Sequence, residues 1–170
     1  MSWESYFFDL ASVVAKNSKC FSRQIGAILV KDKTVISTGY NGPPREVPHC
    51  GSERFYSDTK LRKIIHEAGF EDSFECPRKL FKFPSGEGLH LCPATQAEAN
   101  CIANAARLGI NTKDSWMYVT CGVPCKNCLA LIINAGIQGV VCTSLTLYDD
   151  LSEYILKSSD LIIQVYGGLR

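Results

Sequence analysis

Two cysteines three residues apart carry the clearest chemical signal in the chain. They are Cys125 and Cys128, in the segment Pro124-Cys125-Lys126-Asn127-Cys128. The segment opens a predicted helix, and residues three apart on a helix lie on one face, so both sulfurs can reach one ion. The positive end of the helix dipole favours thiolate, which is a zinc ligand. The spacing therefore favours a metal site, although a Cys-x-x-Cys segment alone is also compatible with a redox pair or with packed core cysteines.

A second predicted helix start, Thr95-Gln96-Ala97-Glu98, places a carboxylate two residues after an amide. Zinc-dependent deaminases of nucleobases carry His-x-Glu followed by Pro-Cys-x-x-Cys. The same frame here reads Gln96-Ala97-Glu98 and then Pro124 to Cys128. In such a frame two helix starts supply three ligands to one metal, which leaves a fourth position for water and lowers the pKa of that water. Glu98 is then placed to carry a proton from the water to the ring nitrogen and the departing ammonia.

The composition favours one domain spanning residues 1–170. The chain has 170 residues, of which 46% are hydrophobic, and single hydrophobic cores are comfortable at roughly 100–200 residues. The formal net charge of +1 disfavours a nucleic-acid-binding face and favours a small substrate. The apolar stretches are far shorter than the ~18 residues of a membrane span, and the N-terminus lacks a signal-peptide pattern. We therefore expect no membrane association and a cytoplasmic location, or the host cytoplasm for a viral protein.

The elements that must position these groups follow from the spacing of apolar residues. The patterns predict helices over 3–16, 94–108, 125–135 and 150–157, and strands over 25–30, 34–40, 116–120, 139–143 and 161–166. This order predicts an α/β sandwich with a mixed sheet of about five strands. Residues 42–92 hold five of the seven prolines and all three histidines, so they form a predicted irregular insertion, with a short helix over 62–71.

Several further stretches match one known family. They are Ser18–Cys20, Gln24–Val30, Ser37–Gly42, Pro84–Leu89, Ala97–Asn100 and Pro124–Cys128. Over most of its length the chain resembles the deoxycytidylate (dCMP) deaminase family of the cytidine deaminase superfamily. The resemblance implies a three-layer α-β-α sandwich and zinc-dependent hydrolytic deamination of dCMP to dUMP in deoxypyrimidine nucleotide synthesis. It also implies a homohexamer with the effectors dCTP and dTTP, and magnesium that accompanies the bound effector.

Carried over by position, the resemblance assigns the catalytic zinc to Cys125, Cys128 and the place of Gln96, and proton transfer to Glu98. The family has histidine where this chain has Gln96. A carboxamide oxygen is neutral and hard, and hence a poor zinc ligand beside two thiolates. Four interpretations stay open: an engineered substitution, a natural loss that leaves a nucleotide-binding subunit, replacement of the ligand by His90 or Cys92, or weak ligation by glutamine with a reduced rate.

The resemblance also implies substrate and subunit contacts. Asn41, Ala97 and Tyr148 would lie near the nucleotide, and Arg107 would lie at a subunit contact linked to regulation. Each side chain has a simpler alternative. Asn41 suits any turn, Tyr148 can be a packing aromatic, and Arg107 can be a solvated cation that the helix dipole favours.

A second metal site is predicted near the insertion. The odd count of nine cysteines argues against a disulfide framework. The candidate zinc ligands are Cys20, Cys50 and Cys92, with His49, Cys76 or His90 as the fourth. A closed four-coordinate zinc would explain how a proline-rich stretch stays ordered, whereas the alternative is buried free thiols. We expect His66 on a helix face, and Cys101, Cys121 and Cys142 in the core.

Overall fold

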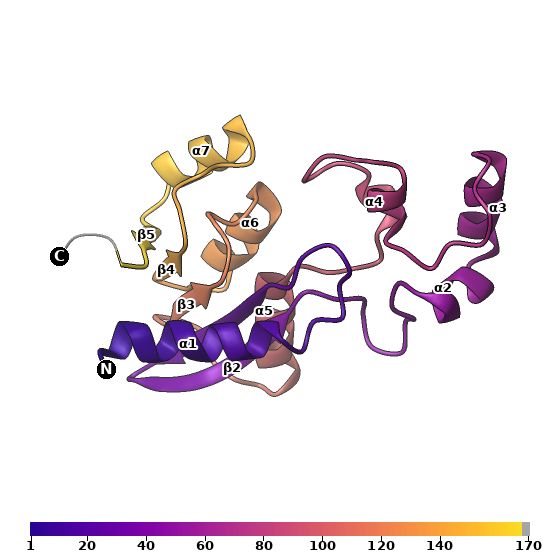
Figure 1. Ribbon diagram of the computed structural model, residues 1–170. Helices are drawn as coiled ribbons and strands as arrows, with labels where there is room; N and C mark the ends of the chain where they lie inside the picture. The colour runs from indigo at the N-terminus through magenta and orange to yellow at the C-terminus, as the bar shows by residue number, and fades with distance from the viewer. Residues whose placement is uncertain (168–170) are drawn as a thin grey trace. The chain divides into compact units, whose positions relative to one another are not determined.

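A mixed five-stranded sheet forms the centre of the fold. The structure, a computed structural model, describes residues 1–167 (Figure 1). The strand order is β2 (Thr34–Tyr40), β1 (Gly26–Lys31), β3 (Trp116–Val119), β4 (Gly139–Cys142) and β5 (Ile162–Val165). β1 is antiparallel to both β2 and β3, whereas β3, β4 and β5 run parallel to one another. The mixed sheet expected from the sequence is confirmed.

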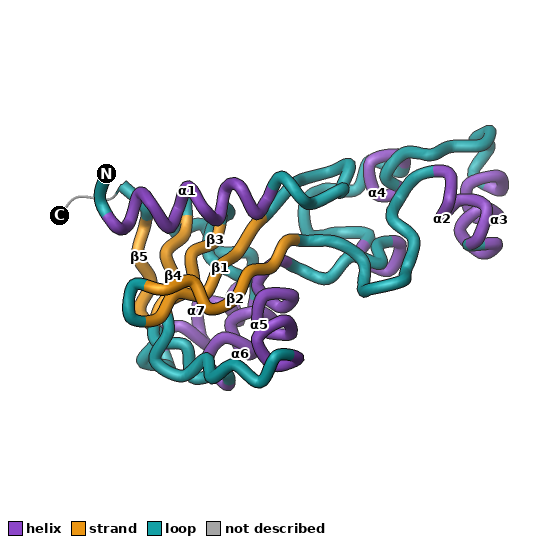
Figure 2. The backbone as a smooth tube through the Cα atoms, turned by 90° about the horizontal axis from the view of Figure 1, so that it is seen from below, coloured by secondary structure: helices purple, strands orange, loops and turns teal. Residues whose placement is uncertain are grey.

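Helices cover both faces of this sheet. Figure 2 shows α1 (Trp3–Ala15) on one face, and α5 (Ala97–Arg107), α6 (Lys126–Asn134) and α7 (Asp150–Lys157) on the other. α1 buries Phe7 and Ala11 against Ile28 and Val30 of β1. The opposite face holds the larger core, to which α5 contributes Ala97, Cys101 and Ala105, and α6 contributes Leu129 and Ile132. The expected three-layer α-β-α sandwich is confirmed.

The apolar run of β1 is explained by its place in the sheet. A strand that is buried on both faces reads as a continuous hydrophobic run instead of an alternating one. Five of the six residues of β1 are buried, and α1 and α5 both pack against it. Cys101, Cys121 and Cys142 are buried as expected. Burial raises the pKa of Cys101 to about 12, which keeps this thiol protonated and unreactive.

The packing divides the chain into two compact units. Within the described residues, the first comprises 1–18, 25–41 and 96–167, and the second comprises 19–24 and 42–95. The second unit contains α2 (Ser52–Ser57), α3 (Thr59–Glu67), α4 (Pro77–Leu80) and the 3-10 helix η1 (Leu89–Leu91). Its core consists of Phe55, Leu61, Ile65 and Leu91. The single domain with an insertion over 42–92 stays a prediction.

One helix of the second unit begins earlier than expected. The pattern predicts a helix over 62–71, whereas α3 spans Thr59–Glu67. The side chain of Asp58 accepts a hydrogen bond of 3.0 Å from the backbone N–H of Leu61, so it caps the helix. At the other end Gly69 has a φ of +82°, which α-helix does not allow. Among the described residues, no helix is long and apolar enough to cross a membrane.

Gly39 sets the distance between β2 and α5, the helix that carries Glu98. A Cβ atom at this position would lie 2.3 Å from the backbone nitrogen of Cys101 and 2.5 Å from the carbonyl oxygen of Ala97. We expect Gly39→Ala to lower the free energy of unfolding by about 1–3 kcal/mol, because backbone atoms cannot move aside cheaply. The midpoint of urea unfolding measures the change. The control Thr38→Ala alters an exposed neighbour on the same strand, and equal midpoints for the two variants would contradict the prediction.

Candidate active site

The starts of α5 and α6 carry the residues that the sequence singled out. α5 is predicted from residue 94 but begins at Ala97, and Gln96 is its extended N-cap with a ψ of 155°. Cys125 is the N-cap of α6, also extended, and Cys128 lies in the first turn of that helix. The two helices pack against each other in the first unit. Donor groups from two distant segments thereby converge at two neighbouring helix starts.

Gln96 contacts both cysteines directly. Its side-chain oxygen Oε1 accepts a hydrogen bond of 3.1 Å from the Cys125 thiol and one of 2.7 Å from the Cys128 thiol. Gln96 is exposed, Cys125 is half-buried and Cys128 is only 2% exposed. Thus the cluster extends from the surface to the core. Gln96, the residue just before α5, thus lies against both cysteines through its carboxamide oxygen.

The two thiols share their protons unequally. The hydrogen bond from Cys128 lowers the pKa of Cys125 to about 5, and the backbone N–H groups of Cys128 and Asn127 act in the same direction. The same side-chain hydrogen bond and burial raise the pKa of Cys128. A thiolate is therefore favoured at the N-cap and a thiol deeper in the helix, so that at neutral pH Cys128 keeps its hydrogen bond to Gln96 Oε1 and Cys125 loses the proton that it donates there. This is the reactive environment that a helix start gives to cysteine.

Glu98 lies buried beside this cluster. It is the second residue of α5 and is 4% exposed. The Cys121 thiol lies 3.9 Å from Glu98 Oε1, and Cys121 is itself 4% exposed. A carboxylate that is buried in this way is a candidate functional residue, because surface solvation does not explain its position. Cys121 is a contact that the sequence does not predict, because a cysteine just after a buried strand is indistinguishable from a core residue.

The other predicted site residues differ in their surroundings. Asn41 is buried, and its Oδ1 accepts a hydrogen bond of 2.8 Å from the backbone N–H of Ile25, which ties the end of β2 to the start of β1. Ala97 is fully buried as the first residue of α5. Tyr148 is 48% exposed and precedes α7, while Arg107 is exposed in the last turn of α5. Their proposed contacts with nucleotide or with other subunits stay predictions.

The positions of Gln96, Cys125 and Cys128 suit a zinc ion, but only the two cysteines are good zinc ligands. Two ligands of a tetrahedral zinc ion lie about 3.5–3.8 Å apart, given bonds of about 2.0–2.3 Å. The Gln96 oxygen is closer than this to both sulfurs, at 3.1 and 2.7 Å. The oxygen and the two sulfurs would therefore have to move slightly apart for a zinc ion to bind between them. The described residues contain no group of three His, Cys, Asp or Glu side chains arranged to hold a metal. Two donors are suitable thiolates, and the third is a weak one.

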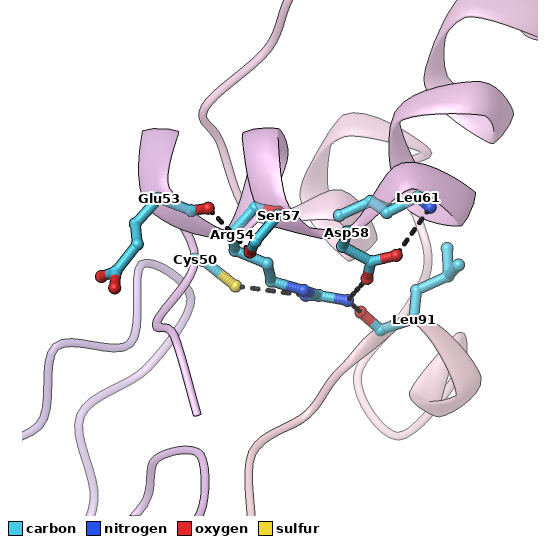
Figure 3. Close-up of polar contacts among 7 residues, drawn as sticks. All are labelled: Cys50, Glu53, Arg54, Ser57, Asp58, Leu61 and Leu91. Carbon is cyan, nitrogen blue, oxygen red and sulfur yellow. Dashed lines mark hydrogen bonds and ion pairs between the residues drawn. The ribbon is translucent and has the colours of Figure 1, made fainter. Parts of the chain in front are cut away.

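The second unit holds the other predicted metal ligands. Arg54 organises this region: its guanidinium donates to the Leu91 carbonyl at 2.8 Å, lies 3.5 Å from Asp58 Oδ2 and lies 3.6 Å from Cys50 Sγ (Figure 3). Burial raises the pKa of the Cys50 thiol, Arg54 opposes this shift, and the charges of Cys76 and Cys92 add to it. Cys50 is therefore electrostatically linked to two of the cysteines that we predicted to share a zinc ion with it.

The remaining candidates of that set are less buried. His49, Cys20 and Cys92 are half-buried, Cys76 is buried, and His90 is exposed with its ring 6.0 Å from the ring of Phe83. Among residues 1–167, no three of these side chains are close enough together to hold a metal ion. A structural zinc site in this unit stays a prediction. His66 is exposed on α3, as expected, and lies 3.0 Å from Asp72 Oδ1.

Comparison with known proteins shows the family to which the chain belongs. A family model described as the cytidine and deoxycytidylate deaminase zinc-binding region matches residues 1–144. Deoxycytidylate deaminase of Schizosaccharomyces pombe is 31% identical over 165 residues, which cover 97% of this chain and 44% of that protein. Deoxycytidylate deaminase of Mycobacterium phage D29 is 31% identical over 144 residues, or 82% of this chain and 92% of that protein. The chain thus spans less than half the length of the yeast relative.

The fold is also shared with solved structures. The dCMP deaminase from cyanophage S-TIM5, in complex with dCMP and dUMP, matches with a TM-score of 0.63 and 19% identity, and the match covers 95% of each chain. At this identity the likeness concerns the fold alone. The sequence relatives and the family model settle the family on their own, and the order of the matched segments agrees with them. The chain belongs to the deoxycytidylate deaminase family of the cytidine deaminase superfamily.

Proposed function

We propose that this chain is a dCMP deaminase-type hydrolase that converts dCMP to dUMP, with a metal centre weakened at Gln96. The observation that carries the proposal is the convergence of three donor atoms beside a buried carboxylate. Gln96 Oε1 lies 3.1 Å and 2.7 Å from the sulfurs of Cys125 and Cys128, and Glu98 is buried two residues further along α5. The names of the relatives support dCMP as the substrate.

The residues divide the chemistry between them. Cys125, Cys128 and the oxygen of Gln96 would hold zinc, which when bound supplies the Lewis acid that activates water. Glu98 takes a proton from the water that adds to C4 of the base, and passes protons to the ring nitrogen and to the ammonia that leaves. Burial keeps bulk water from competing for these protons. The Cys121 thiol, 3.9 Å from Glu98 Oε1, helps to hold the carboxylate.

The nucleotide contacts belong to the same proposal. Asn41 and the backbone at Ala97 would face the sugar and base, and Tyr148 would contact the nucleotide. Asn41 is held rigidly by its 2.8 Å hydrogen bond from Ile25, which suits a residue that orients a ligand. Regulation by dCTP and dTTP with magnesium, a homohexamer and a role for Arg107 at subunit contacts follow from the family resemblance.

The second unit would be stabilised by a structural zinc. Cys20, Cys50 and Cys92 are the proposed ligands, with Cys76, His49 or His90 as the fourth. The charges of Cys76 and Cys92 act on the pKa of Cys50, so these three cysteines lie in one region of the unit. The core of this unit is small, with four buried hydrophobic residues, so a metal would supply stability that packing does not.

A second candidate function is nucleotide binding without turnover. It is favoured by one observation, the carboxamide at the third ligand position, because a neutral hard oxygen binds zinc poorly beside thiolates. In that case the chain would bind deoxycytidine nucleotides and leave their amino group in place.

Zinc content, dCMP binding and dCMP turnover, measured on one preparation, separate these functions. We expect substoichiometric zinc at Cys125 and Cys128, dCMP binding by calorimetry, and slow loss of dCMP absorbance that becomes faster when zinc is added. Binding without turnover at saturating zinc would support the second candidate. Failure to bind dCMP at all, with zinc at full occupancy, would contradict both functions.

A further inference from the structure

We infer that the second unit binds a small phosphate monoester in a hollow beside the start of α3. The hollow has a volume of about 390 Å³, and all of its lining residues lie within 42–95. Small-molecule sites typically measure roughly 300–1,000 Å³. None of Gln96, Cys125 and Cys128 lines it, so the inference goes beyond deamination and does not depend on that activity.

Arg54 supplies the hollow with a guanidinium that is only partly satisfied. The residue is 9% exposed, and it contacts Leu91, Asp58 and Cys50 through Nη1 and Nη2 alone (Figure 3). A guanidinium has five N–H donors, so among the described residues its Nε–H has no acceptor. Ser152 Oγ is the one fully buried side-chain nitrogen or oxygen without a partner in the described chain, so Nε reaches solvent. Because Arg54 lines the hollow, an oxyanion there can accept this hydrogen bond.

The charges around the hollow favour an anion. Lys60 lines it and has no hydrogen bond or ion pair within the described chain, whereas Lys63 of the same helix is paired with Glu67 at 3.6 Å. Asp58 is the one acid of the lining, and both of its oxygens are engaged. Oδ1 accepts a hydrogen bond of 3.0 Å from a backbone N–H of α3, and Oδ2 lies 3.5 Å from Arg54. Two cations and one anion thus leave one net positive charge.

The start of α3 adds further hydrogen-bond donors. Thr59 and Lys60 are the first two residues of this nine-residue helix, and backbone N–H groups at these positions have no partner within a helix. Thr59 is exposed, so its hydroxyl can donate as well. A phosphate ester offers three acceptor oxygens and a charge of about −1.5 to −2 at pH 7, whereas a carboxylate offers two oxygens and one charge. The number of donors therefore favours a phosphate group.

Three apolar residues in the lining indicate that the ligand also has an organic part. They are Val47, Pro48 and Pro93, of which Val47 is 42% exposed and the two prolines are half-buried. Small-molecule sites combine an apolar lining with a few polar groups that orient the ligand. A ring attached to the phosphate would cover apolar surface that inorganic phosphate leaves in water. The chemical class is therefore a phosphate monoester of a small ring compound.

Calorimetric titration of the full chain with phenyl phosphate tests this inference. We expect phenyl phosphate to bind about tenfold more tightly than inorganic phosphate, because its ring buries apolar surface. Lys60→Gln should weaken binding about tenfold, the lower end of the range for a contact with a charged group. The matched control Lys63→Gln makes the same change three residues along α3, at a side chain that is 74% exposed, and should leave the affinity unaltered. Equal affinities of the two variants would overturn the inference.

Two further measurements test the phosphate class and the buried contact. Benzoate carries a carboxylate on the same ring and should bind at least about tenfold more weakly than phenyl phosphate, so equal binding would overturn the choice of phosphate. Arg54→Lys keeps the charge but loses the Nε–H, and should weaken binding about tenfold. Circular dichroism shows whether this variant folds, and a folded variant with unaltered affinity would overturn the role of Arg54. None of these measurements uses dCMP, so failure here is distinct from failure of the proposed deaminase function.

Discussion

Gln96→His is expected to raise both zinc occupancy of the Cys125–Cys128 site and the rate of dCMP deamination. Imidazole nitrogen is a good zinc ligand, whereas the carboxamide oxygen that now lies 2.7 Å from the Cys128 sulfur is a poor one. Metal assistance contributes several kcal/mol of transition-state stabilisation, and each 1.36 kcal/mol is tenfold in rate. We therefore expect kcat/KM for dCMP to rise by at least ~100-fold.

Zinc content by mass spectrometry and the loss of dCMP absorbance measure the two effects on the same samples. Gln96→Ala is the matched control, because it removes the carboxamide and adds no ligand. It should show no gain in either quantity. A Gln96→His protein that is fully loaded with zinc and still inert would show that the fold serves another function, such as nucleotide binding alone.

The starts of α5 and α6 show what the sequence could predict about the site. Spacing along one helix predicted that Cys125 and Cys128 share a face, whereas Glu98 was grouped with them by the signature of zinc-dependent deaminases. The strand Thr34–Tyr40 and the helix Asp150–Lys157 were predicted with the bounds that the structure has. Alternation and helical periodicity are local properties, so they can be read from the chain directly.

The contacts that depend on packing could not be predicted in the same way. Gln96 lies just before α5 and not inside it, a shift of a few residues that places its side chain against both thiols. Helix ends are set by capping geometry, which the alanine-rich pattern before Leu108 does not specify. The contact between Cys121 and Glu98 joins residues 23 positions apart, and no local pattern encodes it.

The second unit was the least predictable part of the fold. Its helices α2, α3 and α4 are short, and burial of Arg54 ties α2 to the carbonyl of Leu91, far along the chain. An arginine in a sequence is normally expected on the surface. Here its guanidinium is satisfied by a backbone carbonyl, by Asp58 and by Cys50, which is why it is 9% exposed. Such a polar network depends on tertiary contacts that charge patterns do not reveal.

Glu98→Gln, made in the zinc-binding Gln96→His protein, is expected to lower kcat for dCMP by about 10²–10⁴-fold, the usual contribution of a positioned general acid–base group. Glutamine has nearly the same shape as glutamate, so it can remain beside Cys121 in a site that is 4% exposed. It cannot accept the proton of the attacking water. Steady-state kinetics with dCMP gives kcat, and zinc content shows whether the metal is retained.

The control for Glu98→Gln is Glu53→Gln, which makes the same chemical change at an exposed position in the first turn of α2 and should leave kcat unaltered. Comparing the change in kcat with the changes in zinc content and dCMP affinity separates a role in proton transfer from a role in the fold. If Glu98 acts on protons, kcat falls while zinc content and dCMP affinity stay within about threefold, because ground-state binding does not require proton transfer. If Glu98 instead only supports the fold, zinc content and dCMP affinity fall together with kcat. A kcat that stays unchanged would remove Glu98 from the mechanism and leave the deaminase proposal without its proton carrier.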